Sequence, residues 1–138
     1  MNPILKKIIK DELKLLKKLL NLLENQYNVL TAIEKDIVVI SNIAEEIDET
    51  IKLIATLEIE KKNILQDKSL SNVIETYGDE ESKELYKETL SLLDAVAMQK
   101  ETNFMFVKQQ LFFTKSLIRA ITPKRNAEIY DSLGKIKK

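Results

Sequence analysis

The sequence predicts an all-α fold: an antiparallel bundle of three long helices with coiled-coil-like packing, a short connector helix and a C-terminal tail. Three observations lead to this prediction. The 138 residues include only two Gly and two Pro, far fewer turn residues than a β-rich chain needs. Leu, Ile, Lys and Glu dominate the composition, as they do in long helices. Apolar residues recur at alternating steps of three and four positions, which is the spacing of a helix face.

Residues 9–54 hold one heptad register of apolar side chains, which only Glu12 and Gln26 interrupt. Apolar residues on both flanks widen this stripe, so we expect each helix to pack against two neighbours, as in a bundle. The register comprises Ile9, Leu16, Leu19, Leu23, Leu30, Ile33, Ile37, Ile40, Ala44, Ile47, Ile51 and Ile54.

A break is expected inside this register, because an unbroken rod of about 60 residues would leave much of its apolar stripe uncovered in so short a chain. The predicted break covers residues 34–36, with Asp36 capping a second helix that starts at Ile37. Pro3 suits the start of the first helix, where its missing N–H costs little. The second helix is predicted to end near Lys68.

Residues 69–81 contain most of the turn signals of the chain. A short connector helix is predicted around Ile74 and is closed by Gly78. Asp79 or Ser82 is the predicted N-cap of the last long helix.

The last long helix is predicted over residues 82–121, and Pro123 ends it because proline cannot continue a helix. The predicted organisation is therefore a helical bundle over residues 1–122 and an amphipathic tail over residues 123–138.

Charge and composition exclude several classes of function. The 22 basic and 22 acidic side chains balance, so no overall field draws in nucleic acid. Cys and His are both absent, which removes thiolate chemistry and the commonest general base and metal ligand. No segment approaches the roughly 20 apolar residues of a membrane span, and the N-terminus lacks the apolar core of a signal peptide. We therefore predict a cytoplasmic protein without stable membrane insertion, nucleic acid, metal or cofactor.

Enzymatic activity is not expected either. Acid pairs such as Glu45 and Glu46 lie outside the apolar rows, on helix faces exposed to water. General acid–base catalysis needs carboxylates held in a desolvated cleft. The sequence also lacks a glycine-rich phosphate loop and a nucleophile motif.

The first helix is rich in lysine on one side and in Leu and Ile on the other, which is typical of helices that lie on a membrane surface. The alternative is that its apolar face belongs to the bundle core and that the lysines keep it hydrated. We favour the bundle, because the same register continues into acidic sequence after residue 44.

All four Phe residues fall within residues 104–113. Residues 104–107 are apolar at four successive positions, and successive residues of a helix point about 100° apart, so one of them must point away from a one-sided core. These side chains either serve the core alone or also form a groove for a peptide. The candidate binding residues are Phe104, Met105, Phe106, Phe112 and Phe113.

The tail, residues 123–138, carries apolar residues at helical spacing and an excess of basic residues. Such a short amphipathic motif is not stable alone. It either folds on meeting a groove or packs back on the bundle. Its apolar residues are Ile129, Tyr130, Leu133 and Ile136.

The sequence resembles the FlgN family of flagellar export chaperones over nearly its whole length. The family's Asp-led second helix is matched by residues 36–40, and its Leu-aromatic pair and final Leu-rich turn by residues 111–113 and 117–118. Its closing Tyr-Asp-x-x-Gly-Lys motif is matched by residues 130–135. Of its two Asn residues three positions apart, the second is Asn103, whereas Lys100 stands in place of the first.

The resemblance implies a cytoplasmic chaperone that binds hook–filament junction (hook-associated) proteins through their C-terminal segments. It also implies delivery of that cargo to the cytosolic domain of the flagellar type III export gate, with docking through the tail tyrosine, Tyr130 here. Together with the residue patterns, it assigns cargo binding to the five Phe and Met candidates and gate docking to Ile129, Tyr130 and Leu133. The main alternative is a structural coiled-coil protein that self-associates through its heptad seam and carries no cargo.

Overall fold

The computed structural model describes residues 1–122, and four helices follow one another there: α1 (Pro3–Thr31), α2 (Ile37–Leu65), α3 (Leu70–Tyr77) and α4 (Glu80–Ile121). The described residues contain no strand. The predicted all-α bundle of three long helices with a short connector is confirmed. The contacts within the chain divide it into a unit of Met1–Asn103 and a second unit that begins at Phe104, and α4 contributes to both.

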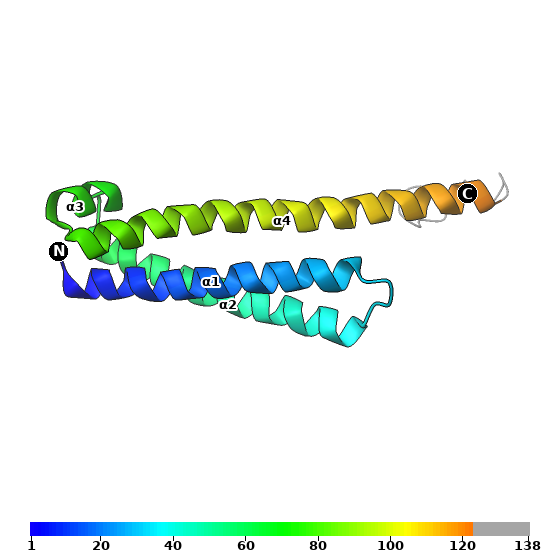
Figure 1. Ribbon diagram of the computed structural model, residues 1–138, viewed down its shortest axis with the longest axis horizontal. Coiled ribbons are helices and arrows are strands. Elements are labelled where there is room, and N and C mark those ends of the chain that lie inside the picture. The colour runs from blue at the N-terminus through cyan, green and yellow to red at the C-terminus, as the bar shows by residue number, and fades with distance from the viewer. Residues whose placement is uncertain (123–138) are drawn as a thin grey trace. The chain divides into compact units, whose positions relative to one another are not determined.

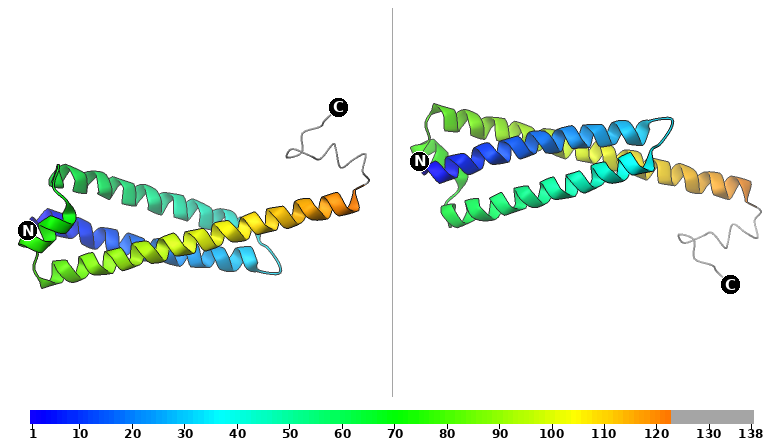
Figure 2. Two further views of the ribbon diagram at one scale, coloured as in Figure 1. Left: turned by 90° about the horizontal axis from the view of Figure 1, so that it is seen from above. Right: turned by 90° about the horizontal axis from the view of Figure 1, so that it is seen from below.

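Within Met1–Asn103, α1, α2 and the first part of α4 lie side by side, and α3 lies at the end that holds the N-terminus (Figure 1). Figure 2 shows α3 and the loop of residues 32–36 at opposite ends of the α1–α2 pair, as expected for antiparallel neighbours joined by short connections.

The predicted break between the first two helices is confirmed. The Asp36 side chain accepts hydrogen bonds from the backbone N–H groups of Val38 (3.0 Å) and Val39 (3.3 Å), and so caps α2. At the start of α1, Pro3 occupies the first turn, and the Asn2 side chain accepts from the N–H of Ile4 at 2.8 Å.

The segment between α2 and α4 follows the predicted turn signals with small shifts. Ser69 caps α3, and Gly78 closes it. Gly78 has φ −75°, so glycine is needed there for space: a Cβ would collide with the carbonyl oxygen of Ile74. Asp79 caps α4 by accepting from the N–H of Ser82 at 2.8 Å, so α4 begins two residues earlier than predicted.

Helix α1 supplies most of the core. Among the described residues, every buried apolar side chain comes from α1 except Ile47 of α2 and Ile74 of α3. One cluster joins Leu19, Leu22 and Leu23 to Ile47, and a second joins the start of α1 to Ile74. Each such Leu or Ile contributes roughly 1.5–3 kcal/mol through burial.

The heptad register overpredicts the core contributed by α2. Ile33 lies fully exposed in the loop, Ile37 is 74% exposed, and Ile51 is also exposed. The prediction that these three residues belong to the core is wrong. The width of the register suggested that α2 packs against two neighbouring helices. Helix α2 instead packs most closely against α1, and a single close neighbour buries a narrower stripe of apolar side chains.

Helix α2 ends at Leu65, three residues before the predicted end, and Gln66 stops it. Gln66 has φ 58° and ψ −116°, a backbone conformation that favours glycine. Its N–H donates to the carbonyl of Lys62 at 2.8 Å, which holds the chain in this turn.

We predict that Gln66→Gly raises the free energy of unfolding by about 1 kcal/mol, because the strain of a Cβ at positive φ outweighs the extra entropy of glycine in the unfolded chain. Urea unfolding followed by circular dichroism measures the change. Gln66→Ala is the control, since it keeps the Cβ and should bring no gain. Equal stability of the Gly and Ala variants would contradict the prediction.

Candidate polypeptide-binding surface

Helix α4 changes character after Asn103. Up to that point it contributes buried side chains, of which Asn103 is the last and is only 5% exposed. We call residues 104–121 the apolar segment of α4. None of its side chains is buried, and Phe106 alone is half-buried.

The five predicted binding residues lie in this apolar segment, and four of them are exposed. Phe112 is 72% and Phe104 60% exposed, and Met105 and Phe113 are exposed as well. In the described structure, therefore, these four side chains do not serve the core. The other large apolar residues of the segment that are exposed are Val107, Leu111, Leu117, Ile118 and Ile121.

The sequence explains why this segment is helical. No Gly or Pro interrupts α4, so the helix continues through its apolar end. Helix α4 has 42 residues, of which the last 18 form the apolar segment. Exposed apolar side chains gathered over such a stretch are typical of interaction sites.

Two polar interruptions of the heptad register turn out to be interhelical contacts that sequence reasoning missed. The first is Gln26, whose side-chain oxygen accepts from Asn103 Nδ2 at 2.9 Å. The same Nδ2 donates to the carbonyl of Leu23 at 2.8 Å, and Gln99 Nε2 donates to Asn103 Oδ1 at 3.0 Å. This network ties α4 to α1 at the last buried residue of α4.

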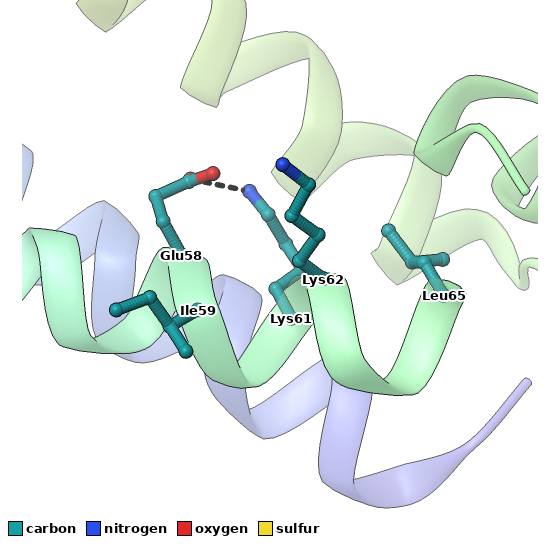
Figure 3. A pocket seen from close by; sticks show the side chains of 5 residues that line it. All are labelled: Glu58, Ile59, Lys61, Lys62 and Leu65. Atoms are coloured by element: carbon teal, nitrogen blue, oxygen red, sulfur yellow. Dashed lines mark hydrogen bonds and ion pairs between the residues drawn. The ribbon is translucent and has the colours of Figure 1, made fainter. Parts of the chain in front are cut away.

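The second interruption is Glu12, which is 3% exposed and pairs with Lys61 of α2 at 3.1 Å. Lys61 also contacts Glu58 at 2.6 Å, as Figure 3 shows among the side chains that line a surface hollow on α2. Among residues 1–122, Glu12 Oε1 finds no hydrogen-bond partner. A charged residue at a buried position of the heptad register needs a partner of opposite charge. Glu12 at such a position therefore predicts a basic partner, but the sequence does not say which residue it is.

Burial raises the pKa of Glu12 to about 7, against the opposing effect of Lys61. The pKa of Lys61 is also raised, because its bonds to the two carboxylates outweigh the opposing effect of burial. For Glu58, the hydrogen bond from Lys61 and the proximity of Glu12 outweigh the effect of burial, and its pKa is lowered.

These shifts predict the pH dependence of stability. A carboxyl whose pKa is higher in the folded than in the unfolded state stabilises the fold at low pH, and this contribution is lost as pH rises from about 4.5 through about 7. Glu58 and Lys61 titrate outside that window, and the chain has no His. We expect the free energy of unfolding to fall by roughly 2–3 kcal/mol between pH 5 and pH 8.

Glu12→Gln should remove most of this fall, because the amide does not ionise. Thermal or urea unfolding at both pH values measures it, and Glu24→Gln, on the same helix but exposed, is the control. A Glu12→Gln protein that loses as much stability as the unaltered protein would contradict the assignment.

The lysines of α1 pair with acids at the start of α4. Lys6 contacts Asp79 at 2.8 Å, and Lys10 contacts Glu81 at 2.6 Å. The hydrogen bond from Lys6 lowers the pKa of Asp79, and that from Lys10 lowers the pKa of Glu81. Because the apolar face of α1 is buried at the same time, α1 follows the bundle interpretation rather than the membrane-surface one.

Three other kinds of feature bear on the function of the described residues: further hollows, membrane spans and metal sites. Two further hollows, of about 300 and 370 Å³, lie at the N-terminal end and between α1 and α2. Within residues 1–122, no helix is long and apolar enough to cross a membrane, and no group of acidic side chains is arranged to hold a metal ion. The predicted gate-docking residues Ile129, Tyr130 and Leu133 lie outside the described residues.

A helical bundle with an exposed apolar helix surface is typical of proteins that bind other polypeptides. The FlgN protein family matches the chain over residues 1–138, and the chain therefore belongs to the FlgN family, whose members are flagellar export chaperones. The resemblance read from the sequence is confirmed. The comparisons found no match among curated proteins and none among solved structures.

Proposed function

We propose that this protein is a cytoplasmic export chaperone that binds the C-terminal segments of hook-associated flagellar proteins and delivers them to the export gate of the type III secretion system. Membership of the FlgN family supports the flagellar role. The exposed aromatic side chains of α4 support the binding role, and they are the single observation that carries the proposal. Binding involves no covalent step, cofactor or metal, and the protein is not an enzyme.

The cargo segment binds as an amphipathic helix along the apolar segment of α4. Phe and Met offer large apolar area, and the flexible Met side chain adapts to partners of different shape. Covering this surface removes apolar area from water on both molecules, which shields the cargo from self-association before export. The contacts are Phe104, Met105, Phe106, Phe112 and Phe113.

We predict that Phe112→Asp weakens binding of these C-terminal segments at least tenfold, which corresponds to about 1.4 kcal/mol, because a carboxylate then faces the apolar side of the cargo helix. Phe112 is exposed, so the bundle should keep its helical content and thermal midpoint. Titration calorimetry with C-terminal segments of the hook-associated proteins of the same bacterium measures the affinity.

Ile59→Asp is the matched control, since Ile59 is an exposed apolar residue on α2. Its affinity for the same segments should stay within about twofold of that of the unaltered protein. Equal losses in the Phe112 and Ile59 variants would show that the apolar segment is not the specific contact.

The tail docks on the cytosolic domain of the export gate through Ile129, Tyr130 and Leu133. We expect Tyr130→Ala to weaken binding to that domain by tenfold or more and to leave cargo affinity unchanged, because the proposal separates the two surfaces. Pull-down or calorimetry with each partner in turn measures both effects. Equal loss of the two activities would mean that the tail has a structural role instead.

A self-associating coiled-coil protein is the second candidate, because an exposed apolar helix surface also suits another copy of the chain. The burial of the apolar face of α1 within its own chain argues against association through the first heptad seam. Sedimentation separates the candidates: a monomer that binds cargo supports the chaperone, and a stable oligomer without cargo affinity supports the alternative.

A further inference from the structure

The charges of α4 change sign along the helix. From residue 80 to residue 101 acidic side chains outnumber basic ones, and Glu101 is the last acidic residue of the helix. The apolar segment that follows carries only basic charges, on Lys108, Lys115 and Arg119. A chain that is neutral overall therefore has a local positive surface at its most apolar helix end.

These basic residues form one ridge. Steps of seven and four residues return to nearly the same direction on a helix, so positions 108, 115 and 119 share one side of α4. The ridge runs between exposed apolar residues, because Phe104 lies four residues before Lys108 and Phe112 four residues after it. A partner that covers these rings also approaches the ammonium groups.

Lys108 and Lys115 make no ion pair within residues 1–122. By contrast, Lys6, Lys10 and Lys17 of α1 each contact a carboxylate within the bundle. A partner that desolvates the two α4 ammonium groups without supplying an opposite charge meets a penalty, and one that supplies carboxylates gains charge-assisted hydrogen bonds.

We propose that the apolar segment of α4 selects amphipathic helices that carry Asp or Glu beside their apolar face, at positions about seven residues apart. This inference rests on the proposed function, since it specifies the chemistry of the cargo segment. The carboxylates meet Lys108 and Lys115 while the apolar side chains of the partner cover Phe104, Leu111 and Phe112. Charge then decides which apolar helices bind.

An anionic membrane surface is the competing partner, and the residue pattern disfavours it. A helix that lies on a membrane needs one broad polar face. In the apolar segment the basic ridge is narrow, and Phe113 and Leu117 lie on the opposite side of the helix. A helix that is apolar on nearly all sides is instead suited to being surrounded by other helices.

The test measures binding of the full chain to C-terminal segments of the hook-associated proteins of the same bacterium. In the charge-reversed variant Lys108→Glu/Lys115→Glu, affinity should fall at least tenfold at low salt. The control Lys35→Glu/Lys52→Glu makes the same change in net charge at exposed sites outside the apolar segment, and its affinity should stay within about twofold. Exchanging the acidic residues of the bound segment for lysine should restore binding to the charge-reversed variant.

Each outcome supports or overturns the proposal. Binding that is insensitive to the charge reversal overturns the charge selection and leaves the proposed function standing. Failure of the unaltered protein to bind any of the segments overturns both. Flotation with vesicles of phosphatidylglycerol and phosphatidylcholine tests for a membrane partner. If the vesicles capture the unaltered protein but not the charge-reversed variant, the partner is a membrane and the proposal is overturned.

Discussion

The structure of this chain depends on burying the apolar face of α1. Most of the stability of a helix in a protein comes from packing of its apolar face, and the leucines and isoleucines of α1 gain their stabilisation only when neighbouring helices cover them. Residues of α2, α3 and α4 pack against the two clusters that it forms. Because α1 is enclosed, its lysines can stay hydrated and pair with the acids that begin α4.

Polar residues within the seam determine how the helices align. Apolar side chains tolerate a shift along the helix axis, whereas a buried amide or carboxylate is satisfied in one register only. Glu12 with Lys61 fixes α2 against α1, and Asn103 with Gln26 fixes α4 against α1. Asn103 lies immediately before the apolar segment, so the contact that fixes the register of α4 also fixes which residues begin the exposed surface.

The sequence predicted the helices well because their signals are local. Asp36, Gly78 and the absence of Gly and Pro from the interiors of the long helices determine where the helices can begin and end. Burial was harder to predict, because it depends on neighbours: Ile37 and Ile51 fit the heptad register and yet are exposed on α2. The partners of Glu12 and Gln26 were missed for the same reason, since pairing across long sequence distances leaves no local signal. The sequence indicated that at least one of residues 104–107 is exposed, because four successive apolar positions cannot all face one core, but this argument did not extend to Phe112 and Phe113.

The central claim is that the apolar segment of α4 is covered by a foreign polypeptide. Amide hydrogen exchange of the full chain, with and without the C-terminal segment of a hook-associated protein, tests this claim directly. The account predicts that added protection concentrates in residues 104–121, with little change in α1 and α2. Protection confined to α1 and α2, with residues 104–121 exchanging as fast as in the free protein, would contradict it.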